Sequence, residues 1–209
     1  MLSHMSRTTP SRTGFVLAGG KSSRMGAGSD QDKDKAFLEF RGQTLLNRAL
    51  AVMGTVCDRV AIVGDPAKFA KYESVVADIF PGCGPLAGIH AALLHSPAEL
   101  NLMLAVDMPF VSRELLAFLF AAAEESDAIV TVPRCGKGLQ PLCAAYRRDF
   151  STVAERALRA GKYKIDAVFS NVSVRVIEED ELAAAGFSEQ SFFNVNTPQD
   201  RLAAEGRTF

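Results

Sequence analysis

The sequence is short of the residues that mark several common classes of protein. Only four of its 209 residues are cysteines (Cys57, Cys83, Cys135 and Cys143), and none belongs to a Cys-x-x-Cys pair. Disulfide frameworks and zinc sites usually show tighter cysteine spacing. We therefore expect reduced thiols with structural roles, as in a cytoplasmic protein.

Histidine is also scarce, and the chain contains only His4, His90 and His95. His90 and His95 are five positions apart and lack the glutamate of a His-Glu-x-x-His zinc motif. We expect both on the surface of an ordinary helix or at its packing edge.

Long apolar runs and a charge excess are missing as well. No apolar run approaches the roughly 20 residues of a membrane span. The polar N-terminal segment lacks the apolar core of a secretory signal, so we expect residues 1–13 to be a disordered extension or a tag remnant. Lys and Arg number 23 against 24 Asp and Glu, whereas nucleic-acid-binding proteins usually carry a basic excess.

What the sequence does contain is the composition and alternation of a globular α/β domain. An apolar fraction of 48% excludes a wholly disordered chain, and the length fits one domain. Short apolar runs predict strands at 14–18, 59–63, 102–106, 128–132, 142–146 and 172–177. Helical spacing predicts helices at 43–54, 85–95, about 150–160 and 199–205, and one from a Ser112 N-cap to 125.

This alternation predicts a mostly parallel central sheet with helices on both faces. The pattern loosens after residue 133, so we expect the C-terminal third to add edge strands and the second half of a cleft. Ligands of such sheets bind beyond the carboxyl ends of the strands. That rule selects the loops after Ala18, Val63 and Val132, and the Asp107-Met108-Pro109 segment.

A glycine-rich loop follows the first predicted strand and reads LAGGKSSRMG over residues 17–26. Adjacent glycines allow close approach of the backbone to a ligand, and Lys21 and Arg24 add positive charge, which suits a di- or triphosphate. A Walker A motif would need glycine at Phe15, and a Rossmann fingerprint would need Gly19 and Gly20 separated. A solvated strand-to-helix turn is the alternative.

The loop and three later segments together resemble one known family. Asp34-Lys35-Ala36 follows the loop, and GPLAG (84–88), Asp107-Met108-Pro109 and NVNTP (194–198) come in order. The chain is similar to the NTP:molybdopterin nucleotidyltransferases, and among them to the molybdenum cofactor guanylyltransferases (MobA family). The resemblance covers residues 14–204, leaves a tail at 205–209, and implies a single-domain Rossmann-like nucleotidyltransferase fold.

The resemblance implies a Mg²⁺-dependent transfer of GMP from GTP to the molybdopterin cofactor, with release of pyrophosphate. A phosphate monoester has its second pKa at about 6, so the attacking phosphate needs no general base. Catalysis then depends on alignment and charge neutralisation. The cations implied for this task are Lys21, Arg24 for the β- and γ-phosphates, and Lys35 for the α-phosphate.

Asp107 is the principal candidate metal ligand. It ends a buried run, where a carboxylate is costly unless it is paired or binds a metal. Mg²⁺ commonly takes one or two protein oxygens together with phosphates and water. The resemblance implies Asn196 as a second ligand, although an Asx turn before Thr197-Pro198 is an equal alternative. A helix N-cap is the alternative for Asp107, but Ser112 already serves the next helix.

The resemblance also assigns the two substrate ends. Asp78 would accept hydrogen bonds from guanine, and the backbone of Leu17, Ala18 and Gly19 would contact the base edge. Gly20, Lys35 and Asp107 complete the nucleotide contacts. Gln140, Asn194 and Asn196 would line the pterin side, where Lys162 and Lys164 either meet the pterin phosphate or are merely exposed. Relatives that use CTP typically have Leu-Ala-Ala-Gly and lack GPLAG, which favours GTP.

Two features depart from the family pattern. The 27–33 spacer is about five residues longer than usual and contains a competing Asp32-Lys33 pair, and Asp65 stands where an asparagine is frequent. A cytidylyl- or other nucleotidyltransferase with a different acceptor is the main alternative, and a non-catalytic nucleotide-binding scaffold is another. The expected partners are GTP, molybdopterin, cofactor-delivery proteins and acceptor molybdoenzymes. We expect a cytoplasmic protein that binds neither nucleic acid nor a membrane.

Overall fold

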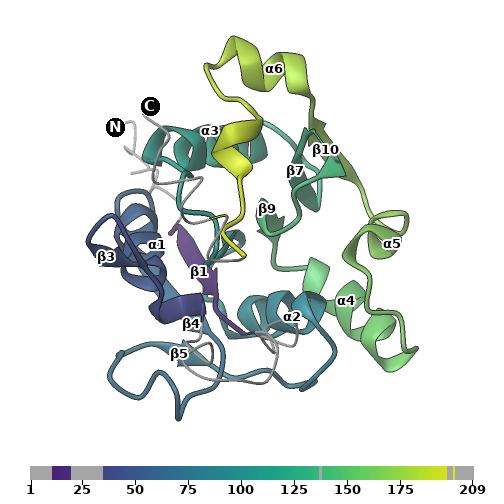
Figure 1. The fold of residues 1–209 in the computed structure, drawn as a ribbon. Coiled ribbons are helices and arrows are strands. Elements are labelled where there is room, and N and C mark those ends of the chain that lie inside the picture. Colours follow the sequence, from purple (N-terminus) through teal and green to yellow (C-terminus); the bar gives the residue numbers. More distant parts are fainter. Residues whose placement is uncertain (1–10, 20–34, 137, 197–199, 201–209) are drawn as a thin grey trace, which may run out of the picture.

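The computed structural model describes residues 11–19, 35–136, 138–196 and 200, and its centre is one twisted β-sheet (Figure 1). The strands follow the order β10-β7-β9-β6-β1-β4-β5, and β8 pairs with β7. Their bounds are β1 Thr13–Leu17, β4 Arg59–Val63, β5 Val75–Val76, β6 Leu100–Ala105, β7 Val130–Cys135, β8 Gly138–Leu139, β9 Cys143–Arg147 and β10 Val174–Ile177.

The sheet is parallel over one half and mixed over the other. β1 pairs in parallel with both β4 and β6, so that Leu17 lies opposite Val63 and Ala105. β4–β5 and β7–β10 are also parallel, whereas β9 runs antiparallel to β6 and β7. The predicted α/β class with a mostly parallel sheet is confirmed.

The strand predicted at 142–146 was expected at an edge, and that expectation is wrong. It is β9, and it lies inside the sheet between β6 and β7, while β10 takes the edge. All four residues from Cys143 to Tyr146 are 0% exposed. A strand that is apolar on both faces and fully buried needs a neighbour on each side, which explains the interior place.

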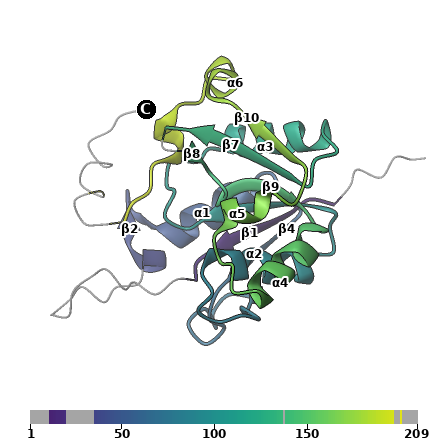
Figure 2. The ribbon, with the colours of Figure 1, turned by 90° about the vertical axis from the view of Figure 1, so that its right-hand side faces the viewer.

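Helices cover both faces of the sheet (Figure 2). α1 (Leu45–Gly54), α3 (Arg113–Glu124) and α6 (Glu179–Ala184) contribute to one core cluster. α2 (Pro85–His95), α4 (Phe150–Arg159) and α5 (Ile165–Phe169) contribute to the other. Strand residues alternate between the two, with Val16 in the first and Phe15 and Leu17 in the second. No helix in the described part of the chain is long and apolar enough to cross a membrane.

Two predicted boundaries shift for local reasons. The helix predicted from 43 begins at Leu45, because β2 (Glu39–Phe40) and β3 (Gln43–Thr44) form a hairpin first. Arg41 and Gly42 have φ of 50° and 79°, the left-handed backbone that a two-residue hairpin turn requires. The strand predicted at 128–132 is β7, which begins and ends later. The helix predicted at 199–205 lies outside the described residues.

Ser112 caps α3 as predicted, and its removal should weaken the fold. The Ser112 hydroxyl accepts a hydrogen bond from the Leu115 amide at 3.2 Å. Ser112→Ala leaves that amide without its cap and should lower the free energy of unfolding by about 1 kcal/mol. Urea denaturation measures this as a lower midpoint at unchanged slope. Ser170→Ala is the control, since the exposed Ser170 hydroxyl donates to the Ala167 carbonyl; equal midpoints for the two variants would contradict the prediction.

Candidate functional site

The carboxyl ends of β1, β4 and β6 meet at one edge of the sheet. Ala18 donates its amide to the Val63 carbonyl at 3.0 Å, and Val106 donates its amide to the Leu17 carbonyl at 3.2 Å. These bonds continue the ladders past the last strand residues. The loops that follow, which begin with Gly19, Gly64 and Asp107, therefore leave the sheet side by side, as the rule for open α/β sheets predicts.

Lys35, Asp107 and Asn196 come together at this edge although they are far apart in sequence. Lys35 lies in the 3-10 helix η1 (Lys35–Phe37), and its Nζ is 3.5 Å from Asp107 Oδ2. The same Nζ donates a hydrogen bond to Asn196 Oδ1. The backbone joins the other two segments, because the Val195 amide donates to the Asp107 carbonyl at 2.8 Å.

The surroundings of Asp107 make its carboxylate a site for positive charge. The Asp107 side chain is 19% exposed and that of Lys35 29%. Burial raises the pKa of Asp107, and the Lys35 charge and hydrogen bond oppose that rise. A carboxylate that the fold strips of water gains most from a cation, so this position favours binding of one.

The donor set fits Mg²⁺. Asp107 and Asn196 each point a side-chain oxygen at the Lys35 ammonium, so two oxygens already converge on one cation. Among residues 11–19, 35–136, 138–196 and 200, no three His, Cys, Asp or Glu side chains cluster as a metal site. One carboxylate and one amide oxygen suit an ion that shares its ligands with phosphates and water, rather than a closed structural metal.

Asp78 occupies the neighbouring position beyond β5. A Cβ placed on Gly19 would lie 3.9 Å from its Oδ2, and one on Gly88 would lie 3.6 Å from its Oδ1. That Oδ1 is buried and has no hydrogen-bond partner in the described part of the chain. Burial raises the pKa of Asp78. A buried acceptor with no partner among the described residues, next to Gly19 at the start of the loop after β1, is able to accept a hydrogen bond from a ligand.

The residues predicted for the pterin side line one cavity of about 690 Å³. Gln140, Asn194 and Asn196 all face it, and Gln140 Nε2 is held by the carbonyls of Cys135 and Gly138 at 3.3 Å each. The other residues that line this cavity are Cys135, Glu189, Gln190, Phe192, Phe193 and Asp200. Asn196 thus belongs both to this cavity and to the Lys35–Asp107 cluster.

Comparison with known proteins decides what kind of domain carries this site. Residues 14–176 match the family model of the MobA-like NTP transferase domain. The chain belongs to this family. It is therefore a nucleotidyltransferase, and the resemblance read from the four sequence motifs is confirmed.

The sequences of relatives match this MobA-like NTP transferase over nearly its whole length. A probable molybdenum cofactor guanylyltransferase from Pelotomaculum thermopropionicum is 39% identical over 92% of this chain and 91% of that protein. A molybdenum cofactor guanylyltransferase from Desulfosudis oleivorans is 36% identical over 92% of this chain and 94% of that protein. Among solved structures, this chain resembles molybdopterin-guanine dinucleotide biosynthesis protein A from Archaeoglobus fulgidus, with a TM-score of 0.79 and 29% sequence identity. The match covers 92% of this chain and 96% of that one.

Two residues in the site of this MobA-like NTP transferase, Asp200 and Glu189, were not predicted from the sequence. Asp200 Oδ2 accepts the Asn196 amide at 2.9 Å, and Glu189 lies against the β7–β8 turn. Asp200 stands four residues after Asn196 across Thr197-Pro198, a spacing that could have suggested a turn partner. Glu189 reaches the cavity only through packing of η2 (Glu189–Phe192), which no local pattern predicts.

The described part of the structure does not bring the remaining predicted residues into this site. Gly20, Lys21 and Arg24 are outside the described residues. Lys162 and Lys164 are exposed and do not line the cavity. The Asp65 carboxylate accepts the Ala67 amide at 2.9 Å and closes a local turn.

The cysteine and histidine predictions have mixed outcomes. All four cysteines are free thiols, as expected. His95 is exposed, as expected of a helix surface. His90 is only 1% exposed, which the surface or packing-edge prediction did not anticipate. The reason is that its ring packs edge-on against Phe80, with centroids 5.3 Å apart, where α2 meets α4.

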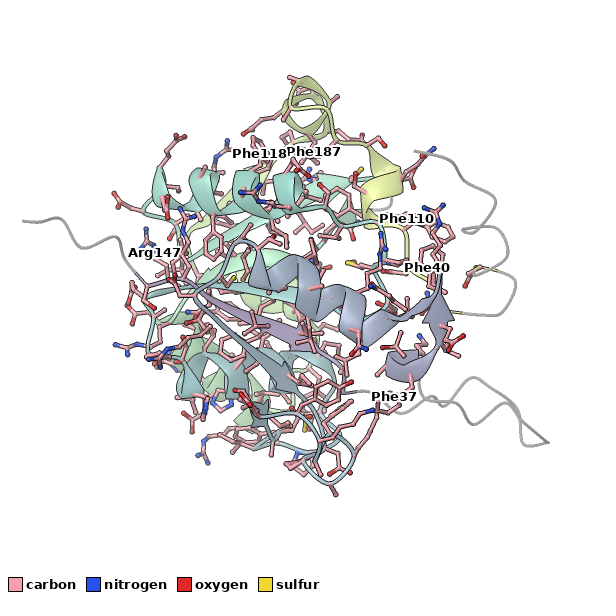
Figure 3. The ribbon with its side chains drawn as sticks, turned by 90° about the vertical axis from the view of Figure 1, so that its left-hand side faces the viewer. Phe37, Phe40, Phe110, Phe118, Arg147 and Phe187 are labelled. Carbon is pink, nitrogen blue, oxygen red and sulfur yellow. The ribbon has the colours of Figure 1, made fainter. Side chains whose placement is uncertain are left out.

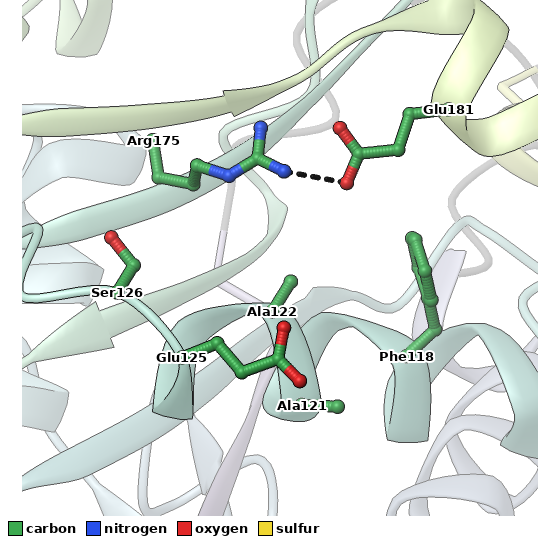
Figure 4. A pocket seen from close by; sticks show the side chains of 7 residues that line it. All are labelled: Phe118, Ala121, Ala122, Glu125, Ser126, Arg175 and Glu181. Carbon is green, nitrogen blue, oxygen red and sulfur yellow. Dashed lines mark hydrogen bonds and ion pairs between the residues drawn. The ribbon is translucent and has the colours of Figure 1, made fainter.

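A second cavity of about 310 Å³ opens between α3 and β10 (Figure 4). Its lining includes Arg175 and Glu181, which pair at 2.6 Å. None of the residues predicted for the site of the MobA-like transferase contributes to it. It lies by the C-terminal end of α3, away from the strand ends where the site residues gather.

Proposed function

We propose that this nucleotidyltransferase transfers GMP from GTP to the terminal phosphate of molybdopterin. The names of the relatives described above support both substrates. The observation that carries the proposal is the position of the Lys35–Asp107–Asn196 cluster. Through Asn196 it joins the cavity lined by Gln140 and Asn194, and the unsatisfied Asp78 carboxylate follows β5 in the same sheet.

The reaction needs little chemistry from side chains. An oxygen of the pterin phosphate forms a bond to the α-phosphorus of GTP, and the bond to the β-phosphate oxygen breaks to release pyrophosphate. The attacking monoester is largely ionised at neutral pH, so no base has to remove a proton. The protein aligns the two phosphates and neutralises the charge that builds up on the leaving group.

Each part of the site has a role in this proposal. Lys35 contacts the α-phosphate, and the backbone of Leu17, Ala18 and Gly19 contacts the base edge. Gly20, Lys21 and Arg24 contribute the glycine-rich loop and its charges to the phosphates. Asp107 and Asn196 would hold Mg²⁺, which would supply positive charge for the phosphate oxygens. Gln140, Asn194 and Asn196 face the pterin.

Asp78 is proposed to select guanine. Guanine presents an N1–H and an N2 amino group side by side, and one carboxylate accepts both. Asp78→Asn replaces one acceptor with a donor and should lower kcat/KM for GTP by about 10–100-fold, since a hydrogen bond to a charged group contributes about 1.5–3 kcal/mol. Steady-state rates with GTP measure this effect.

The same carboxylate should give GTP affinity a pH dependence. Burial raises the pKa of Asp78, so its ionised form is lost at a higher pH than for an ordinary aspartate. KM for GTP should therefore rise as the pH falls through that raised pKa, and Asp78→Asn should remove this rise. Asp127→Asn, at an exposed aspartate, is the control and should keep the wild-type profile.

Labelled nucleotides test the proposed function directly. We expect label from α-³²P-GTP, but not from α-³²P-CTP, to enter molybdopterin with stoichiometric release of pyrophosphate. Label from CTP would favour the cytidylyltransferase alternative. GTP binding without pyrophosphate release would favour a scaffold. The cytoplasmic location, the delivery proteins and the acceptor molybdoenzymes stay predictions from the sequence.

A further inference from the structure

Each residue of the Lys35–Asp107–Asn196 cluster has a phenylalanine close to it in sequence. Phe40 follows Lys35, Phe110 follows Asp107, and Phe193 precedes Asn196. The Phe110 ring packs against the other two rings, with its centroid 5.5 Å from that of Phe40 and 6.2 Å from that of Phe193. The segments that carry Lys35, Asp107 and Asn196 therefore contact one another through these rings as well as through the cluster.

Arg48 of α1 connects this aromatic contact to the strand end. Its Nε donates to the Pro109 carbonyl at 2.5 Å, and its guanidinium carbon lies 5.7 Å from the Phe40 ring centre. Pro109 stands between Asp107 and Phe110. A guanidinium that bonds the backbone and faces an aromatic ring restrains both, so Arg48 limits movement of the Asp107 segment relative to the β2–β3 hairpin.

The packing of Phe110 on Phe40 fits a rigid support. Phe40 is 1% exposed, and the half-buried ring of Phe110 meets it nearly at right angles, at 88°. Edge-to-face ring contacts have a defined geometry, and a ring packed on the protein interior transmits displacement rather than absorbs it. A shift of Phe110 would therefore move Asp107, while Lys35 stays attached to the Phe40 side.

We infer that Phe40, Arg48, Phe110 and Phe193, the positioning cluster, set the spacing between Lys35 and the oxygens of Asp107 and Asn196. The inference rests on the proposed function, because it gives these residues a task only if that spacing serves phosphoryl transfer. Phe110 and Arg48 are positioning residues and act through Asp107.

The chain offers matched controls for a purely structural role (Figure 3). Phe118 is half-buried like Phe110 and packs on Phe187 with centroids 5.6 Å apart. Arg147 is half-buried like Arg48 and donates to the carbonyls of Ala128 and Ser126 at 3.1 and 2.7 Å. Phe118 thus matches the ring contact of Phe110, Arg147 matches the backbone hydrogen bond of Arg48, and both lie apart from Phe40 and Phe110 in Figure 3.

The test compares kcat, KM for GTP and Tm of Phe110→Ala and Arg48→Met with those of Phe118→Ala and Arg147→Met. We expect kcat to fall about 10–100-fold in the first pair, as for a misplaced catalytic group. KM for GTP should change less than about three-fold, because Asp78 is outside the positioning cluster. The control pair should keep kcat within about two-fold at a similar loss of Tm. Phe110→Tyr, which keeps the ring, should restore most of the rate, whereas Arg48→Lys, which loses the planar guanidinium, should restore less.

Equal losses of kcat in all four alanine and methionine variants would overturn the inference, and so would wild-type kcat in Phe110→Ala. An inactive wild-type protein would instead contradict the proposed function. Crystal structures of wild type and Phe110→Ala without substrate then decide the inference separately. We expect the Lys35–Asp107 contact to be kept in the first and lost in the second; an unchanged contact in the variant would overturn it.

Discussion

Replacing Asp107 with alanine should lower kcat about 100–1,000-fold. Removal of one preorganised oxyanion-hole donor from an active site has an effect of this size. The carboxylate is largely buried at the end of β6, and one of its oxygens is 3.5 Å from the Lys35 ammonium. Its loss leaves Asn196 as the remaining candidate metal ligand in our proposal, and leaves Lys35 without its ionic partner. The rate of labelled dinucleotide formation at saturating GTP and Mg²⁺ measures the effect.

Stability separates loss of this function from loss of the fold. Because burial raises the pKa of Asp107, the fold disfavours its ionised form, and removing the carboxylate should not cause a large fall in Tm at neutral pH. Asp127→Ala is the matched control at an exposed aspartate and should keep the wild-type rate. Full Mg²⁺-dependent transfer by Asp107→Ala would show that the metal assignment is wrong.

Lys35→Met should lower kcat by about 100-fold, because our proposal places Lys35 at the reacting α-phosphate, and a positive charge contributes more in a partly buried site than in water. Methionine keeps much of the length and apolar stem of lysine but has no charge. Lys35→Arg should recover little, since a planar guanidinium does not reproduce a compact ammonium. Single-turnover rates with GTP measure the chemical step apart from product release.

The partners of Lys35 allow a sharper test. Asp107 and Lys35 are in contact, so the effects of removing both should be smaller than the sum of the separate effects on activation free energy. Lys164→Met, at an exposed lysine that does not line the cavity, should keep the wild-type rate. Additive losses in the Lys35→Met, Asp107→Asn double variant would mean that the two groups act independently.

Local patterns were enough to predict most elements of the parallel half of the sheet. The runs around Val16, Ile62 and Leu104 are apolar on both faces, and such runs belong to covered parallel strands. The Ser112 cap followed from residue type and spacing alone, and the structure confirms it. The family resemblance assigned Lys35, Asp107 and Asn196 to one site without predicting their contacts with one another, and their catalytic roles stay predictions.

What local patterns could not predict depends on contacts between distant segments. The place of β9 inside the sheet follows from which strands flank it, and its sequence gives no direction of pairing. Arg48 looked like an ordinary polar residue on an amphipathic helix, yet it bonds the carbonyl of Pro109. The burial of His90 likewise follows from the packing of α4 on α2, which was beyond the reach of helical spacing.

The hydrogen bond from the Val195 amide to the Asp107 carbonyl joins two segments that are far apart in sequence. Ribosomes deliver the Val195 segment after the Asp107 segment, so Asp107 can acquire this partner only after the residues between them have been made. A ligand that contacts Asp107 and Asn196 together binds the docked segment in preference to the undocked one. By mass action such a ligand stabilises docking, and an undocked C-terminal segment lowers the apparent affinity of the whole protein for that ligand.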